Sequence, residues 1–113
     1  MAFSDSWADF ADNIKNGAGD LAEKTFGDFI PQAQSDAAAF LESVGEDLRR
    51  WGDLLAQGDL KPLEFKSLVK GQKALAEMQA LTAIGILKTR VDHFRTGLIS
   101  LIVKSAFGVI GIG

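Results

Sequence analysis

The sequence contains no cysteine and no tyrosine, and its 113 residues include only one histidine and two prolines. Without cysteine the chain forms no disulfide framework and offers no thiolate nucleophile. Catalysis requires a nucleophile, a base and an orienting group within reach of one another, and His93 next to Asp92 is not such a set. The Glu-x-x-His pairs that build metal sites in helical bundles do not occur either. These absences predict a non-enzymatic protein that uses no cofactor and no bound metal.

Basic residues are also too few for a nucleic-acid-binding protein. The lysines at 61, 66, 70 and 73 make one basic side of a predicted helix, but no aromatic residues alternate with them and the net charge is −3. We therefore expect no nucleic acid partner. The first residues lack the basic patch and apolar run of a signal peptide. The expected location is the cytoplasm or an export route without a cleavable signal, with membrane association as an alternative.

The residues that are abundant favour an all-α fold. Hydrophobic residues make up 47% of the chain, and the supply of Ala, Leu, Phe, Ile and Gly suits packed helices. A chain of this length forms one small domain with a limited core. We predict an antiparallel helical hairpin with a very long C-terminal helix and an amphipathic N-terminal helical arm, completed by oligomerisation.

Residues 1–30 form the predicted acidic arm, and residues 31–113 form the predicted hairpin. Apolar residues recur every three or four positions along the arm, which places them on one helix face. Gly17 and Gly19 are expected to divide the arm into two jointed pieces, and Pro31 is expected to end it. The residues expected to dock the arm on the rest of the protein are Phe3, Trp7, Phe10 and Ile14.

The hairpin begins with a helix that is expected to start near Ser35 or Asp36, either of which can cap it, and to end at Gly58. After a short turn, Pro62 suits the first position of the next helix, and Glu64 suits its first turn. The apolar spacing of 4, 3, 4, 3 resembles a coiled-coil seam. The predicted seam of the hairpin consists of Leu41, Val44, Leu48, Trp51, Leu55, Leu68 and Leu75.

The second helix of the hairpin has no further proline and is predicted to run from Pro62 to about Phe107. A helix of roughly 46 residues would be ~69 Å long, too long for a compact domain of this size. The three glycines at 71, 85 and 97 are the expected places for a bend or a close approach.

Charge is distributed unevenly between the two halves of the sequence. Residues 1–60 carry 12 acidic and 4 basic residues, a net charge of −8, whereas residues 61–113 carry 3 acidic and 8 basic residues, a net charge of +5. This asymmetry favours docking of the halves, within one chain or between chains. The hairpin register makes Asp47 and Lys70 a plausible flanking pair. Asp53 with Lys66 and Glu46 with Lys73 also fit the register, but the heptad phase turns these four side chains away from the seam, toward solvent or another subunit.

Residues 97–113 are apolar around nearly the whole circumference of a helix, so they need a buried environment. A core made by several copies is one such environment. A membrane is the other, although 17 residues span only ~25 Å of a hydrocarbon core of about 30 Å and Lys104 falls near the middle. The residues predicted to form an oligomer interface, or to meet a membrane, are Leu87, Val91, Phe94, Leu98, Leu101, Ile102, Phe107 and Ile110.

Three functions are consistent with these patterns. The leading hypothesis is a self-assembling structural or scaffold subunit, a homo-oligomer that acts through helix–helix packing. The alternative is a membrane-active or membrane-associated protein that inserts its apolar C-terminal segment. The third is a carrier that binds a small apolar ligand or docks a partner protein through residues 97–113.

Overall fold

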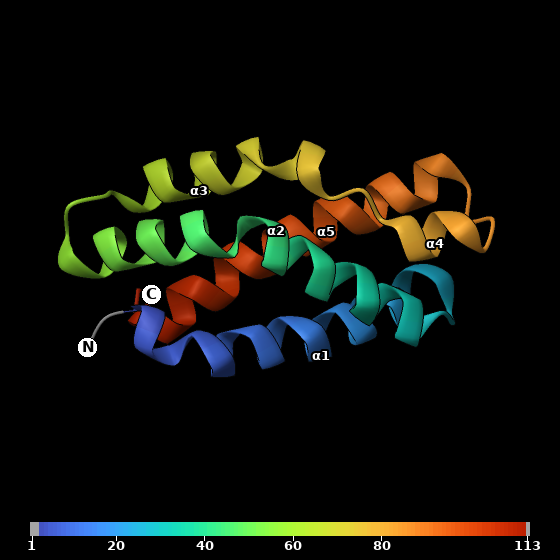
Figure 1. Ribbon diagram of the computed structural model, residues 1–113, viewed down its shortest axis with the longest axis horizontal. Coiled ribbons are helices and arrows are strands. Elements are labelled where there is room, and N and C mark those ends of the chain that lie inside the picture. Colours follow the sequence, from blue (N-terminus) through green and yellow to red (C-terminus); the bar gives the residue numbers. More distant parts are fainter. Residues whose placement is uncertain (1–2, 113) are drawn as a thin grey trace.

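The computed structural model describes residues 3–112, which form an elongated helical bundle without a β-strand (Figure 1). The all-α prediction is therefore confirmed at the level of fold class. The elements are the 3-10 helix η1 (Phe3–Ser6), α1 (Trp7–Phe26), α2 (Ile30–Gln57), α3 (Pro62–Gly71), the 3-10 helix η2 (Lys73–Leu75), α4 (Gln79–Ala83) and α5 (Lys88–Ile110). Both α1 and α3 lie beside α2, and α5 packs against all three of these helices.

The N-terminal arm is one continuous helix, so the predicted joint at Gly17 and Gly19 is wrong. α1 continues as a helix through both glycines. At each of them a side chain from another helix packs directly against the backbone. The side chain of Leu101 lies on Gly17, and the side chains of Ile30 and Gln34 lie on Gly19. The missing side chains allow close helix packing here, which offsets the conformational freedom of glycine.

The start of α2 also differs from the prediction. The helix begins at Ile30, so Pro31 lies in its first turn instead of ending the preceding segment, and Ser35 and Asp36 lie inside the helix. Proline is tolerated in a first turn because its missing N–H has no intrahelical acceptor there. Gly27, with φ 75°, ends α1, and Phe29 adopts the left-handed conformation at φ 68°. These two residues reverse the chain direction between α1 and α2.

The turn from α2 to α3 follows the sequence prediction closely. Gly58 terminates α2 with φ 82°, and α3 begins at Pro62. The Glu64 carboxylate accepts a hydrogen bond of 2.9 Å from the backbone N–H of Lys61, which caps the start of α3. These features are local, since each depends on residues within a few positions of the turn.

The single long C-terminal helix is wrong, because the chain from residue 62 onward is divided into α3, η2, α4 and α5. The breaks fall after Gly71, at Met78, which has φ 56°, and at Gly85, which has φ 86°. Gly71 and Gly85 were expected bend sites, whereas α5 runs uninterrupted through Gly97. α5 ends at Ile110, three residues beyond the predicted end, where Gly111 takes the left-handed conformation.

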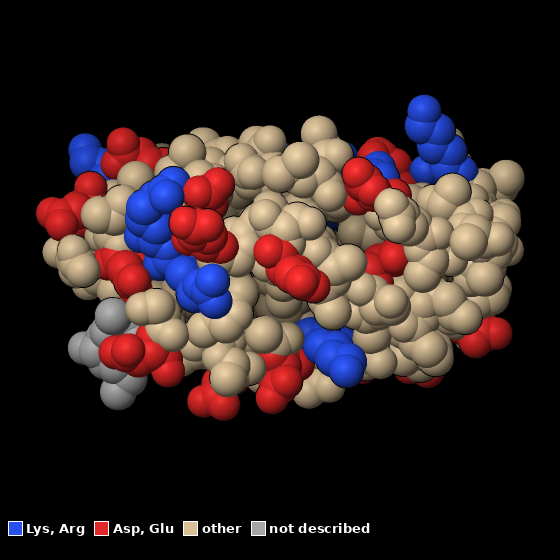
Figure 2. All heavy atoms as spheres, viewed as in Figure 1, with Lys and Arg blue, Asp and Glu red and all other residues tan. Residues whose placement is uncertain are grey.

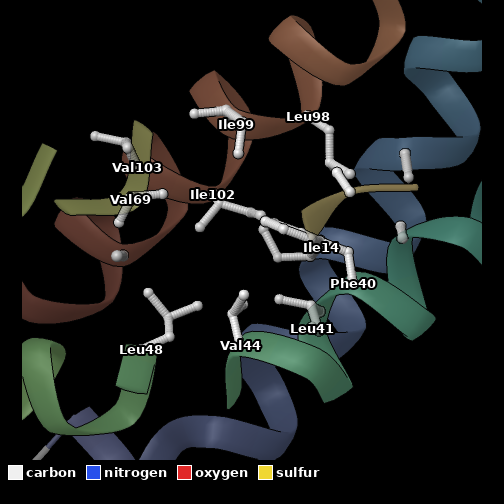
Figure 3. Packing of buried hydrophobic residues seen from close by; sticks show 14 of the residues in the cluster. Ile14, Phe40, Leu41, Val44, Leu48, Val69, Leu98, Ile99, Ile102 and Val103 are labelled. Carbon is white, nitrogen blue, oxygen red and sulfur yellow. The ribbon is translucent and has the colours of Figure 1, made fainter. Parts of the chain in front are cut away.

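The core lies between α1, α2, α3 and α5, and Figure 3 shows side chains from these helices pointing toward one another. Ile14 of α1 and Ile102 of α5 are completely buried in it, and Leu48 of α2 is nearly so. Val69 contributes from α3. Because η1 and α1 belong to this same cluster, the arm is part of the core instead of a separate appendage.

Gly52 is the position in the core with the least room for a side chain. An added Cβ would clash with the ring of Phe3, which is buried against α2. We expect Gly52→Ala to lower the free energy of unfolding by about 1–3 kcal/mol, the usual cost of overpacking a core. Urea unfolding measures this, with Gly71→Ala as the control, because nothing lies within 4 Å of the Cβ position there. Equal stability of Gly52→Ala and the wild type would contradict the placement of Phe3.

Candidate interaction surfaces

Most of the residues predicted to form an oligomer or membrane interface lie inside the single chain. Figure 1 shows α5 running alongside the other long helices. Phe94, Leu98 and Ile102 are completely buried, Val91 is nearly so, and Leu101, Phe107 and Ile110 are half-buried. Only Leu87 is largely exposed, with 68% of its surface accessible.

The cover over α5 comes largely from α1, by reciprocal contacts at glycines. Leu101 of α5 lies on Gly17 of α1, and Leu21 of α1 lies on Gly97 of α5. Each glycine removes the Cβ that would hold the helices apart. The apolar face of α5 thus finds its buried environment within one copy of the protein.

The docking residues of the arm form an aromatic cluster against α2. Phe3, Phe10 and Ile14 are buried, and Trp7 is half-buried. The Phe3 and Phe10 rings meet edge to face with their centroids 5.0 Å apart, and the Trp7 ring centroid lies 5.3 Å from that of Phe10. The guanidinium of Arg49 lies over the Trp7 ring at 5.0 Å, a cation–π geometry.

The predicted seam residues divide by helix. Leu41, Val44, Leu48 and Leu55 of α2 are buried, and Trp51 of α2 is half-buried. Of the two residues from the following segment, Leu68 is half-buried and Leu75 is exposed. Leu75 follows the break after Gly71, so it is not part of α3.

Two aspartates of α2 cap the starts of other elements, a role that the sequence analysis missed. The Asp36 carboxylate, only 6% exposed, accepts hydrogen bonds from the backbone N–H groups of Ala80 (2.8 Å) and Leu81 (2.9 Å) at the start of α4. The Asp53 carboxylate accepts one of 2.8 Å from the N–H of Ser4 in η1. Asp36 lies between the buried residues Ala33 and Ala37 on the apolar face of α2. A charged residue on an apolar helix face needs a polar partner, and this was the available signal.

Two arginines of α5 bind the ends of other elements in the same way. Arg90 donates a hydrogen bond of 2.8 Å to the carbonyl of Thr25 and lies over the Phe26 ring, which holds the end of α1. Nε of Arg95 donates a hydrogen bond of 2.6 Å to the backbone carbonyl of Ala76, a buried residue just after η2. Cations suit these sites because the last carbonyls of a helix carry partial negative charge.

The ion pairs among residues 3–112 do not join the acidic half of the sequence to the basic half. Asp47 pairs with Arg50 at 2.8 Å instead of with Lys70, and Lys73 lies 3.6 Å from Asp92 instead of meeting Glu46. The expected flanking pair of Asp47 and Lys70 therefore does not form. Asp53 accepts a hydrogen bond from Ser4, as described above, and is not paired with Lys66.

Asp92 has a second partner on its own helix, because Arg95 donates a hydrogen bond of 3.0 Å to it. This hydrogen bond, together with the positive charge of Lys73, holds the pKa of the Asp92 carboxyl below its usual value. Asp92, Lys73 and Arg95 all belong to the basic half of the sequence, so these ion pairs do not neutralise any charge of the acidic half.

An apolar surface remains uncovered on the outer side of α3. We call it the α3 apolar surface and define it by Leu60, Leu63 and Leu68, which line one shallow depression together with Glu64 and Ser67. Leu63 has 77% of its surface exposed, the largest value among the exposed large hydrophobic residues described. Exposed Lys61 and Lys66 flank it. Large apolar side chains exposed together often mark a binding surface.

A groove of about 350 Å³ lies between α1 and α2. Its walls are formed by small or apolar residues, and its rim carries charges of both signs. We call it the α1–α2 groove. It is lined by Trp7, Ala11, Asp12, Lys15, Ala38, Leu41, Glu42, Gly45 and Arg49.

A second hollow of about 580 Å³ lies between α2 and residues 75–80. Serine, glutamate and glutamine side chains share its lining with Phe40 and Met78. Groups of three or more potential metal ligands do not occur within the described part of the chain. His93 is exposed on α5.

α5 is the one helix among the described residues that is long and apolar enough to cross a membrane, judged by length and composition. Core helices of water-soluble bundles also meet this criterion. Phe94, Leu98 and Ile102 of α5 are buried, and 33% of its most apolar stretch is buried overall. Comparison of the chain with protein-family models, with curated protein sequences and with solved structures finds no match.

Proposed function

We propose that the protein is a non-enzymatic, self-assembling structural subunit that associates through the α3 apolar surface. The observation that carries this proposal is Leu63, which is 77% exposed beside Leu60 and Leu68 on a bundle whose other long helices are well packed. Burying a leucine side chain stabilises a protein or complex by about 1.5–3 kcal/mol, so covering this surface with another helical surface would be favourable.

The proposal moves the interface away from α5. Val91, Phe94, Leu98 and Ile102 already pack inside the chain, and a second copy would have to unfold the bundle to reach them. α3 is at the outer edge of the bundle, with contacts to α2 and α5 on its inner side (Figure 1). Association through α3 leaves the fold intact.

Replacement of Leu63 tests the proposal directly. Light scattering of the wild type over a series of concentrations is expected to show association, and Leu63→Asp is expected to raise the dissociation constant about tenfold or more, as loss of a central interface residue does. Leu87→Asp is the matched control, because Leu87 is similarly exposed at the start of α5 and receives the same change. Circular dichroism verifies that all three proteins have the same helix content.

Two results would contradict the proposal. A wild type that stays monomeric at every concentration rules out self-assembly of the purified protein. Loss of association in Leu87→Asp with normal association in Leu63→Asp would assign the interface to the start of α5 instead.

Membrane association is the second candidate, and the composition of α5 is the observation that favours it. Exposed Lys61, Lys66 and Lys88 give the basic half of the protein an affinity for anionic lipid. Under this candidate the wild type sediments with vesicles of anionic lipid but not with vesicles of neutral lipid. Absence of sedimentation with both would exclude peripheral binding.

A further inference from the structure

The segment between α3 and α5 adopts a conformation that its own sequence does not favour. All residues at positions 72–81 are Ala, Leu, Glu, Lys, Gln or Met, which have the highest helix propensities. The chain nevertheless leaves the helical conformation at residues 76–78, and Met78 is left-handed with φ 56°. That conformation is sterically unfavourable for a residue with a Cβ. Local preference and tertiary structure therefore conflict in residues 72–87.

Contacts with other elements hold this segment in its broken form. The Asp36 carboxylate of α2 caps the start of α4. Nε of Arg95 of α5 binds the carbonyl of Ala76, and the side chain of Met78 is only 2% exposed in the core. Because these contacts come from α2 and α5, they are made only while both helices pack against the segment.

The apolar pattern of the sequence continues across the break as if α3 and α5 were one helix. Apolar residues recur at intervals of three, four or seven positions, so an uninterrupted helix places them on one face. They are Phe65, Val69, Ala76, Ala80, Ile84, Leu87, Val91, Phe94 and Leu98. The members on α3 are buried, and so are those inside α5, whereas Ile84 and Leu87 are 42% and 68% exposed. On the face shown in Figure 2, the end of the molecule around α4 carries few charged side chains.

We propose that residues 72–87 are a hinge that converts to helix and joins α3 to α5, and that the released α5 then packs in the bundle of a second copy. Each α5 makes with the second copy the contacts that it otherwise makes with its own α1, such as Leu101 on Gly17. The exchange is reciprocal, so it closes as a symmetric dimer. The two hinges cross near the symmetry axis, where Ile84 and Leu87 are covered by the second copy.

This inference goes beyond the proposed function, because exchange of α5 requires neither Leu63 nor the α3 apolar surface. Association through α3 leaves the bundle closed, whereas exchange requires the bundle to open. A wild type that is folded at low concentration therefore stays in the closed form. The exchanged dimer forms when the chain refolds at high protein concentration.

Gly85→Ala is the variant that promotes the exchange. Gly85 has φ 86° in the closed form, which alanine disfavours, and alanine also has the higher helix propensity. After refolding from urea at high protein concentration, the fraction of dimer measured by light scattering is expected to rise about tenfold over that of the wild type. Gly71→Ala is the matched control, because Gly71 is helical already and nothing lies within 4 Å of its added Cβ.

Leu87→Pro is the variant that blocks the exchange. Leu87 has φ −59° in the closed form, the value that proline adopts, so the closed form accepts this change. Proline inside a continuous helix clashes with the preceding turn. Leu87→Pro is therefore expected to stay monomeric, also in combination with Gly85→Ala. Its comparison with the wild type tests the hinge even if Gly85→Ala folds poorly.

A distance within one chain identifies the exchange. The sequence has no cysteine, so Lys66→Cys together with Lys104→Cys allows specific spin labelling. Both positions are exposed, and the nearby rings of Phe65 and Phe107 have their centroids 5.9 Å apart, so the labels lie close together in the closed form. In one continuous helix the same positions are ~57 Å apart. Refolding with an excess of unlabelled chains restricts the measurement to distances within one chain.

The outcomes separate this inference from the proposed function. A dimer with the long distance, which persists when Leu63→Asp is added, supports exchange of α5. A dimer with the short distance of the monomer overturns the exchange and leaves association through α3 standing. Absence of a dimer in both the wild type and Gly85→Ala, or equal dimer fractions in the wild type and Leu87→Pro, also overturns it.

Discussion

Phe94→Ala is expected to lower the free energy of unfolding by about 3–5 kcal/mol, the usual cost of deleting a buried phenylalanine ring. Phe94 is completely buried, and its ring stacks on that of Phe26 with the centroids 5.8 Å apart and the planes at 21°. The substitution removes the contact that ties α5 to the end of α1, and it leaves a cavity that the packed helices cannot fill.

The measurement is urea unfolding at low protein concentration, with Phe94→Leu as the control that retains most of the apolar volume. The leucine variant is expected to lose clearly less stability than the alanine variant. Because Phe94 packs within one chain, the loss should be the same at every protein concentration. A loss that grows with concentration would instead place Phe94 at a subunit interface.

Asp36→Ala is expected to lower the free energy of unfolding by about 2–3 kcal/mol, since hydrogen bonds to a charged group contribute about 1.5–3 kcal/mol. The substitution leaves the N–H groups of Ala80 and Leu81 without the carboxylate that accepts them. α4 has only five residues, so it lacks the length to remain helical without this cap.

Hydrogen exchange locates this effect in the chain. The amides of Ala80 and Leu81 should exchange faster in Asp36→Ala, and the amides in the middle of α1 should change less. Asp36→Asn is the matched control, because its amide oxygen can accept one hydrogen bond and its stability should be intermediate. Unchanged exchange at Ala80 and Leu81 would show that the carboxylate does not hold α4.

Local signals in the sequence predicted several elements of the fold correctly. Gly58 ends α2, and Pro62 and Glu64 begin α3, because turn and cap preferences depend on neighbouring residues alone. The apolar stripe of the arm, including Phe10 and Ile14, also identified residues that are buried. The α3 apolar surface was not predicted from the sequence. Leu63 lies outside the predicted seam, and its exposure depends on which side of α3 packs inward.

By itself the sequence determined the all-helical class, the apolar faces of the helices and the unequal charges of the two halves, since helix periodicity and charge are properties of neighbouring residues. Only the tertiary structure decided where the helices stop. Asp36 has the chemistry of a cap for its own helix, yet it caps α4 some 44 residues away, and Arg95 binds the carbonyl of Ala76 in the same segment. Such contacts between distant residues divide the predicted long helix. The packing of α5 against α1 then buries, within one chain, most of the residues that were predicted to form an oligomer interface.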